Sequence, residues 1–358
     1  MKTNIGIIGC GNISGNYLTN AKKYEVLNIT ACADLFRDKA EAIAAKYGIP
    51  KVCTVEELLA DPSVEIILNL TTPDSHALIA KQALLAGKSV YNEKPLTISR
   101  EEGEEILKIA RERGLRIGCA PDTFLGAGYQ TCRKLIEDGE IGTPIAAAAF
   151  FMNHGHESWH PNPEFYYQKG GGPMLDMGPY YLTALVSLLG PVKRITGSTK
   201  TTFLERYYTR DGNKKTIKVE TPTHIVGTLD FQNGATAIII TSFDIWAHHF
   251  PYIEIYGTEG SISAPDPNGF EGSVKIWKPS TKEWQEVPLL PTRAQSGRSI
   301  GLADMALGIH QGRPHRANGD LAFHVLDIMH TIHDASDKNT HIFLSSTCNQ
   351  PEPLFKDF

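Results

Sequence analysis

Several features that mark large classes of protein are missing from this 358-residue sequence. No apolar run approaches the roughly 18 residues that a membrane-spanning helix needs. The start, Met1 to Ile7, lacks the apolar stretch and the small-residue cleavage site of a signal peptide. No run of lysine and arginine stands out and the formal net charge is −5, which argues against a nucleic-acid partner. We therefore expect a cytoplasmic protein that binds neither membrane nor nucleic acid.

Cysteine is scarce, and its spacing excludes two further classes. The six cysteines include no CxxC pair; they are Cys10, Cys32, Cys53, Cys119, Cys132 and Cys348. Scattered cysteines are typical of reduced thiols and not of a disulfide framework or a zinc site. We expect them to be small buried side chains, and we expect no metal.

The first 120 residues alternate short apolar runs with helical patterns. The run Val64–Leu70 is almost wholly apolar, as in a strand buried on both faces. The expected strands are Asn4–Gly9, Leu27–Ala33, Lys51–Cys53, Val64–Leu70, Ser89–Asn92 and Arg116–Ala120, with helices near Gly15–Lys22, Asp38–Tyr47, His76–Ala86 and Arg100–Arg113. This alternation predicts an α/β domain, residues 1–120, with right-handed crossovers and a parallel sheet.

After residue 120 the pattern becomes rich in β-runs separated by turn signals. The expected strands are Thr143–Asn153, Thr223–Phe231, Ala235–Ser242, Tyr252–Tyr256 and Val274–Lys278, and the expected helices are Gly128–Asp138, Met174–Leu189, Ser299–Gln311 and Gly319–Ser336. We predict a second domain, residues 121–358, of the α+β class with an open, largely antiparallel sheet. Because its strands carry apolar residues on both faces while helices cover one, we expect a homo-oligomer, a dimer or tetramer, joined through the open face.

A glycine turn follows the first predicted strand. Gly9, Gly11, Asn12 and Ile13 lie in a GxGxxG-like stretch, with Ser14 in place of the third glycine. Such a turn lets the backbone approach a pyrophosphate at a helix N-terminus, as in the Rossmann fold.

Asp34 follows the second strand, where a carboxylate accepts hydrogen bonds from the ribose hydroxyls of NAD. It would repel the 2′-phosphate of NADP, although the nearby Arg37 softens this preference. The alternative is that Asp34 only caps a helix.

Two further segments directly follow predicted strands. They are therefore expected to face the crevice where open α/β sheets bind ligands. Thr71, Thr72, Pro73 and His76 form the first, which can also start a helix capped by Ser75 or Asp74. Glu93, Lys94 and Pro95 form the second.

With these motifs in order, the sequence resembles the Gfo/Idh/MocA family (glucose–fructose oxidoreductase and inositol dehydrogenase). The resemblance extends to Gly170–Gly172, to Leu175–Gly178, to Gly257–Gly260 and to a final helix around Ala322–Met329. It implies an NAD-dependent oxidoreductase acting on a sugar, polyol or sugar derivative, and it implies a homo-oligomer.

Lys94 is the first predicted catalytic residue. An ammonium beside a hydroxyl or carbonyl can polarise it and move a proton while hydride passes to or from the nicotinamide. Burial and neighbouring charges can lower the pKa of a lysine toward the working range. The alternative is a surface lysine in a turn.

Asp176 and Tyr180 complete the predicted catalytic set. The family usually has D-x-G-x-H-x-x-D here, and this chain keeps Asp176 and Gly178 but has Tyr180 in place of the histidine and Thr183 in place of the second aspartate. The spacing of four puts Asp176 and Tyr180 on one helical face. Proton transfer through the usual histidine is therefore in doubt. Either Lys94 or Tyr180 performs the acid–base role of that histidine, or Tyr180 only packs against its neighbours.

A stretch with three histidines, a glutamate and a tryptophan, residues 153–161, is suited to sugar hydroxyls and a sugar ring. The predicted substrate-binding residues are Asp122, His156, Trp159, His160 and Tyr181. The set His154, His156 and His160 could instead bind a metal.

Two other functions stay open at this point. One is an NAD-dependent glycoside hydrolase that works by oxidation, elimination and reduction without net use of NAD. The other is a regulatory protein that binds NAD and catalyses nothing, which Glu93–Pro95 and Asp176 argue against.

Overall fold

The computed structural model describes residues 2–210, 212–291 and 297–354. The chain divides into two compact units. The first contains Met1–Ala127, Pro291–Leu326 and Pro351–Phe358, and the second contains Gly128–Leu290 and Asp327–Gln350. The first compact unit thus includes two segments from late in the chain. The predicted boundary at residue 120 instead marks the change in strand pattern along the sequence.

A parallel sheet forms the centre of the first unit. Its strands lie in the order β3-β2-β1-β4-β5-β6, and all adjacent pairs are parallel. Their bounds are β1 Thr3–Ile8, β2 Leu27–Ala33, β3 Lys51–Val52, β4 Ile66–Asn69, β5 Ser89–Asn92 and β6 Ile117–Cys119. β4 and β5 are buried along their whole length, as their apolar runs predict for strands covered on both faces. The predicted α/β class and parallel sheet are confirmed, and the strand order is that of the Rossmann fold.

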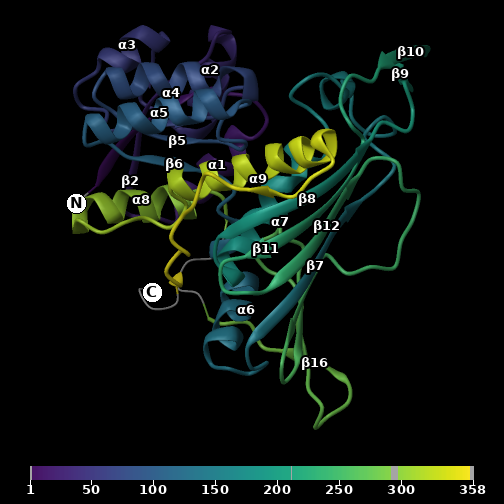
Figure 1. Ribbon diagram of the computed structural model, residues 1–358. Coiled ribbons are helices and arrows are strands. Elements are labelled where there is room, and N and C mark those ends of the chain that lie inside the picture. Colours follow the sequence, from purple (N-terminus) through teal and green to yellow (C-terminus); the bar gives the residue numbers. More distant parts are fainter. Residues whose placement is uncertain (1, 211, 292–296, 355–358) are drawn as a thin grey trace. The chain divides into compact units, whose positions relative to one another are not determined.

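Helices connect these strands in the expected alternation (Figure 1). They are α1 Ser14–Ala21, α2 Arg37–Tyr47, α3 Val55–Ala60, α4 His76–Leu85 and α5 Arg100–Glu112. Another helix of this unit, α8 Ile300–Gln311, comes late in the chain and connects no two of these strands, and short 3₁₀ turns lie at η1 Pro73–Ser75 and η2 Thr123–Leu125. α3 and α5 each begin with a capping box, Thr54 with Glu57 and Ser99 with Glu102, in which side chain and backbone satisfy each other's free N–H groups. The core between helices and sheet includes Ile67, Val90 and Ile106.

In the late segment of the first unit, residues 315–318 cover the edge strand β6. The Cys119 N–H donates to the Ala317 carbonyl at 3.0 Å, and His315 Nε2 contacts the Ile117 carbonyl at 3.0 Å. A bridge between Gly118 and Asn318 lies between these contacts. The backbone groups of β6 that would otherwise be open for aggregation are thereby paired.

The second unit is built on a nine-stranded sheet in the order β16-β15-β14-β13-β7-β12-β11-β8-β17. Every adjacent pair is antiparallel except β7 with β12, so the predicted largely antiparallel sheet is confirmed. The bounds are β7 Pro144–Met152, β8 Val192–Lys200, β11 His224–Phe231, β12 Thr236–Ser242, β13 Ile253–Gly257, β14 Ser261–Ala264, β15 Val274–Trp277, β16 Trp284–Val287 and β17 Ile342–Phe343.

Helices cover one face of this sheet. They are α6 Ala127–Glu137, α7 Pro173–Leu189 and α9 Gly319–Lys338, and η3 Glu164–Tyr167 is a 3₁₀ turn. Figure 1 shows α6 and α7 on the same side of β7, β11 and β12. On β12, Ile239 is buried under this layer while its neighbour Ile238 is 42% exposed on the other face. Among the described residues, no helix combines the length and apolarity needed to cross a bilayer.

A separate hairpin joins β9 Glu205–Arg210 to β10 Asn213–Lys218. These two strands are not among those expected from the sequence, and neither is β8, because their segments are rich in lysine, arginine and threonine. The hairpin is held by a small apolar cluster of its own, made of Tyr208, Ile217, Val219, Tyr167 and Phe243. Packing against neighbours, which sequence periodicity does not show, stabilises these strands.

Candidate functional site

The glycine turn of the first unit has the shape that its composition predicts. Gly9 has φ +98°, and a Cβ built there would lie 2.6 Å from the carbonyl group of Leu70, so only glycine fits. Beyond the turn, Gly11 and Asn12 are exposed and Ile13 is half-buried. The Ser14 hydroxyl donates to the Gly11 carbonyl at 2.6 Å as α1 begins. The turn thus presents open backbone at a helix N-terminus, which attracts anions.

Asp34 lies at the end of β2, beside this turn. Its Oδ2 accepts the Cys10 N–H at 2.7 Å and its Oδ1 accepts the Phe36 N–H at 2.9 Å. Each carboxylate oxygen can still accept a further hydrogen bond. The side chain therefore both orders the turn and keeps acceptor capacity for a ribose hydroxyl. Arg37 is exposed and pairs with Glu41 at 2.8 Å within α2.

The buried ring of His76 lies between the segment that follows β4 and the turn at Pro95. Nδ1 of this buried ring lies 2.7 Å from the Pro95 carbonyl and Nε2 lies 3.1 Å from the Thr71 carbonyl. Burial lowers the pKa of His76, and a neutral ring donates only one hydrogen, which the shorter contact assigns to Nδ1. His76 therefore donates to the turn at Pro95 and lies beside the Thr71 carbonyl, while Thr72 and Pro73 stay exposed.

Glu93 and Lys94 form that turn, at the end of β5. The Glu93 carboxylate is buried, and its Oε1 accepts the Tyr17 hydroxyl at 2.7 Å while Oε2 accepts the Lys94 N–H at 2.8 Å. Burial and then the Glu93 charge raise the pKa of Tyr17, which keeps its hydroxyl protonated as a donor. The peptide between Lys94 and Pro95 is cis. The half-buried Lys94 is thus linked through Glu93 to Tyr17 on α1, the helix that starts at the glycine turn.

Two asparagines at the carboxyl ends of β4 and β5, Asn69 and Asn92, were not singled out from the sequence. The Asn69 amide donates to the Asn92 side chain at 3.0 Å, and Asn69 Oδ1 accepts the Thr71 hydroxyl at 2.7 Å. Asn92 in turn donates to the Leu96 carbonyl at 3.1 Å. Both side chains are fully buried, so the two loops share one satisfied polar network, which rigidifies them. A signal existed, because each asparagine is the last residue of a buried strand whose position the sequence predicts.

Asp122, predicted to contact substrate, is fully buried in the first unit. Its Oδ2 accepts the Gly301 N–H at 3.1 Å, and Arg298 Nη1 lies 3.6 Å from its Oδ1. Burial raises the pKa of Asp122, and the Arg298 charge opposes that effect. In this arrangement Asp122 anchors the start of α8, and its contact with substrate stays a prediction.

In the second unit, Asp176 lies in the first turn of α7 and meets a histidine from another segment. His156 Nε2 is 3.2 Å from Asp176 Oδ2. The His156 ring is buried among Trp159, Tyr166 and Phe243, with ring centroids 4.0–5.1 Å away. A carboxylate in contact with one ring nitrogen orients an imidazole. The structure therefore brings together two residues for which the sequence predicts separate roles.

The two neighbouring tyrosines of α7, Tyr180 and Tyr181, are buried. Tyr180 is 5% exposed, whereas Tyr181 is 1% exposed and its ring lies 6.0 Å from that of Phe151. Burial raises the pKa of Tyr181 above its ordinary range. Tyr181 thus has the surroundings of a core side chain, and its role toward substrate stays a prediction.

The histidines of the 153–161 stretch point to different neighbours. His154 stacks on Trp246 at 3.4 Å between ring centroids, and His160 Nδ1 accepts the Asn162 N–H at 3.1 Å. Within the described ranges, no group of three His, Cys, Asp or Glu side chains is placed to hold a metal ion. Trp159 is 64% exposed and stands at the edge of His156. A flat exposed indole is suited to the apolar face of a ring ligand.

Two family models match this chain. Residues 3–120 match a model described as an oxidoreductase family with an NAD-binding Rossmann fold, and residues 129–263 match one described as the GFO/IDH/MocA C-terminal domain. The two matched segments are consecutive and together span most of the sequence.

Characterised relatives and a solved structure agree with these models. The chain is 28% identical over 264 residues to a 1,5-anhydro-D-fructose reductase of Ensifer adhaerens, covering 72% of this chain and 74% of that protein. It is 24% identical over 304 residues to a D-xylose dehydrogenase of Paenarthrobacter nicotinovorans, covering 78% and 77%. The crystal structure of an NAD binding oxidoreductase from Klebsiella pneumoniae superposes with a TM-score of 0.84 at 21% identity, covering 96% and 99%. At that identity the structural match supports the fold.

Proposed function

This chain belongs to the Gfo/Idh/MocA family of NAD-binding oxidoreductases, and on that premise we propose that it transfers a hydride between nicotinamide and a carbon of a sugar, polyol or sugar derivative. The family resemblance noted in the sequence is confirmed. Relatives named as reductases and dehydrogenases of 1,5-anhydro-D-fructose and D-xylose support a small carbohydrate as the substrate class.

The first unit fits NAD, the cofactor expected from its sequence and from the matched model. When bound, NAD supplies the nicotinamide carbon that accepts or donates the hydride. The open backbone at Gly11–Ile13 would hold the pyrophosphate, and the spare acceptor capacity of Asp34 would hold the adenosine ribose. We further propose that Thr71, Thr72 and Pro73 border the cofactor, with the buried ring of His76 packed beside Thr71.

Lys94 holds and moves the proton of the reacting hydroxyl. Its ammonium donates hydrogen bonds and, in the reverse direction, polarises a carbonyl oxygen. Glu93 fixes the turn by accepting the Lys94 N–H, and the Tyr17 hydroxyl fixes Glu93. This link between Lys94 and the glycine-turn helix is the single observation that best supports the proposal, because one chain of contacts orders both proton donor and cofactor turn.

On the substrate side, we propose that Asp176 and Tyr180 act in catalysis and that His156, Trp159, His160, Tyr181 and Asp122 bind the carbohydrate. A carboxylate that orients an imidazole presents both hydrogen-bond acceptors and donors to sugar hydroxyls. The exposed Trp159 ring offers an apolar surface for a sugar ring.

The test uses NADH absorbance with a panel of aldoses, ketoses, anhydro-sugars and polyols in both directions. Lys94→Ala is expected to abolish turnover while NADH still binds. Lys81→Ala, which removes an exposed lysine paired with Glu105 on the same unit, is the matched control. Retention of more than about a tenth of the wild-type kcat in Lys94→Ala would remove Lys94 from the proton-transfer role.

Two further proposals concern the protein in the cell. The open face of the nine-stranded sheet, with the exposed Ile238 and a hollow lined by alanines of β7, supports a homo-oligomer joined through that face. The six cysteines are free and buried, which supports a reducing compartment, the cytoplasm.

The two other functions that the sequence leaves open gain no support. Neither the matched models nor the relatives named above point to glycoside hydrolysis or to a protein without turnover.

A further inference from the structure

The β9–β10 hairpin touches one particular loop of the second unit at successive positions. That loop, residues 153–163, connects β7 to η3 and carries His156, Trp159 and His160. On β9, the alternate residues Arg206, Tyr208 and Arg210 contact it or its end. Arg206 meets the first part of the loop, Arg210 Nη1 donates to Asn162 Oδ1 at 2.8 Å, and the Tyr208 hydroxyl donates to Glu164. Alternate residues of a strand share one face, so one face of β9 holds the loop along its length.

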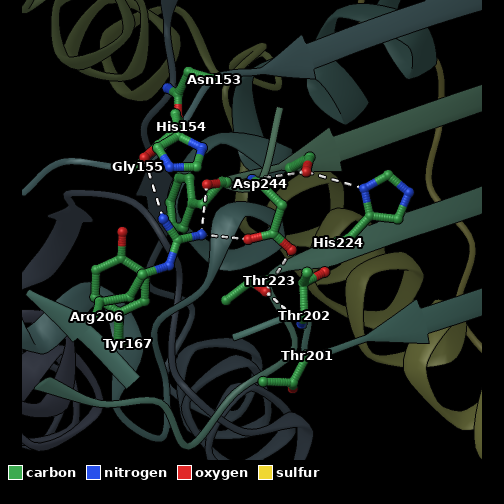
Figure 2. Close-up of polar contacts among 12 residues, drawn as sticks. Asn153, His154, Gly155, Tyr167, Thr201, Thr202, Arg206, Thr223, His224 and Asp244 are labelled. Carbon is green, nitrogen blue, oxygen red and sulfur yellow. Dashed lines mark hydrogen bonds and ion pairs between the residues drawn. The ribbon is translucent and has the colours of Figure 1, made fainter. Parts of the chain in front are cut away.

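Arg206 is buried, and Figure 2 shows its guanidinium hydrogen-bonded to the His154 carbonyl and to the Asp244 carboxylate. Its Nη1 donates to the His154 carbonyl at 3.3 Å and to Glu157 Oε1 at 3.2 Å. Its Nη2 donates to the Phe243 carbonyl at 2.8 Å and to the Asp244 carboxylate. A planar guanidinium with several donors suits such a junction, whereas an ammonium is a single point charge.

The acceptors of Arg206 are themselves held in place. Asp244 Oδ2 accepts the Thr223 hydroxyl at 2.8 Å, and Glu157 Oε2 accepts the Tyr167 hydroxyl at 2.6 Å. Both carboxylates are nearly buried, with 5% and 11% of their side-chain surface exposed. We call Arg206, Glu157, Asp244, Tyr167 and Thr223 the Arg206 cluster. Its members come from the loop, η3, β9 and the ends of β11 and β12, so it joins segments far apart in the sequence.

The loop conformation that this cluster holds requires glycine at position 155. Gly155 has φ +87°, and a Cβ built there would lie 2.1 Å from the Tyr167 hydroxyl and 2.3 Å from Glu157 Oε2. The next residue, His156, is thereby carried to Asp176, where Nε2 lies 3.2 Å from the carboxylate. Trp159 and His160 follow, and their N–H groups both donate to the His156 carbonyl. Movement of Arg206 would release the loop that positions all three side chains.

We propose that the β9–β10 hairpin is the specificity element of this enzyme and that Arg206 is its positioning residue, which fixes the 153–163 loop so that His156 and Trp159 meet a carbohydrate in one arrangement. The part of this proposal that concerns substrate rests on the proposed function. Arg206 itself acts through the loop and does not contact the reacting atoms.

The experiment compares the wild-type chain with Arg206→Lys, which keeps the positive charge but loses the planar set of donors. Tyr208→Phe is a milder second variant that removes the hydroxyl that donates to Glu164 and keeps the ring. Arg194→Lys is the matched control, because Arg194 pairs with Asp230 on the outer part of the large sheet. Hydrogen exchange followed by mass spectrometry measures the protection of the loop amides and needs no substrate. Steady-state kinetics on the carbohydrate panel measures substrate specificity.

In Arg206→Lys, the Trp159 and His160 amides are expected to exchange about tenfold faster or more, while the amides of the glycine turn and NADH affinity do not change. KM for the best carbohydrate is expected to rise on the order of tenfold with a much smaller change in kcat, and discrimination between sugars is expected to narrow. Tyr208→Phe is expected to speed exchange mainly near residues 162–167. Arg194→Lys should match the wild type.

Unchanged loop exchange in both hairpin variants would overturn the proposal. Faster exchange with unchanged KM and unchanged sugar discrimination would overturn the specificity role. If the wild-type chain turns over no carbohydrate, the proposed function fails, and the exchange measurement still decides whether Arg206 positions the loop.

Discussion

His315 should make the stability of this protein depend on pH in a way that one substitution removes. The ring is buried against β6, with Nε2 3.0 Å from the Ile117 carbonyl. Burial lowers the pKa of His315 to about 4, with Asp304 opposing the effect and Arg116 adding to it. In an unfolded chain the pKa of histidine is about 6.5.

The sign and size of the effect follow from these two values. Between pH 6.5 and about 4 the unfolded chain binds a proton at His315 that the folded chain does not, so stability falls as the pH falls through this window. One pKa unit corresponds to about 1.4 kcal/mol, so the gap of about 2.5 units corresponds to about 3 kcal/mol. Below pH 4 the folded form is also protonated, and no further loss comes from this group.

The assay is urea unfolding at pH 7 and pH 4, in the wild type and in His315→Gln, which keeps a donor near the Nε2 position but does not titrate. Far-UV circular dichroism and hydrogen exchange of residues 117–119 are the signals to follow. Tryptophan fluorescence would miss the first unit, because Trp159, Trp246, Trp277 and Trp284 all lie in the second. We expect the wild type to lose about 3 kcal/mol more than the variant between the two pH values.

His249→Gln, at an exposed histidine, is the matched control and should follow the wild type. Equal losses in the wild type and in His315→Gln would refute the reasoning, since the buried imidazole would then contribute nothing to the pH dependence.

Four other predictions concern the site and the assembly. Tyr180→Phe should lower kcat by roughly 10²–10⁴-fold with little effect on urea unfolding if the phenol moves a proton, and near-wild-type kcat would show that Tyr180 only packs. If Asp34 holds the adenosine ribose as proposed, its charge would repel a 2′-phosphate, so NADH should bind more tightly than NADPH when each is titrated by its own fluorescence; equal or tighter NADPH binding would contradict this role of Asp34. Gly9→Ala should abolish NADH binding, because its Cβ would lie 2.6 Å from the Leu70 carbonyl group; retained affinity, again by NADH fluorescence, would show that the turn tolerates the change. Light scattering at micromolar concentration should give an oligomer that Ile238→Glu weakens, whereas a monomeric wild type would end the case for an interface on the open sheet face.

The parallel sheet and the glycine turn could be predicted because their signals are local. A strand buried on both faces must be largely apolar, as Ile66–Leu68 is, and a backbone that turns against another strand must use glycine, as at Gly9. The alternation of such strands with helices then leaves few topologies open. Placement of Lys94 at a strand end follows from the same alternation.

Polar networks and polar strands could not be predicted in this way. Asn69 and Asn92 are buried because they satisfy each other and the two adjoining loops. The β9–β10 hairpin has the composition of a solvated loop, and its strands depend on packing between Tyr208 and residues far away in the chain.

The amino-acid sequence by itself determined the order of the elements, the cofactor turn and the strand ends that carry Asp34 and Lys94, since each depends on periodicity and backbone conformation over a few residues. Only the tertiary structure decided that His156 meets Asp176, that Arg206 holds the loop that carries His156, and that the segment around His315 returns to cover β6. These contacts join residues from 20 to 198 positions apart. Side chains so far apart meet only when the whole chain has packed, and no local pattern records which partner each will find.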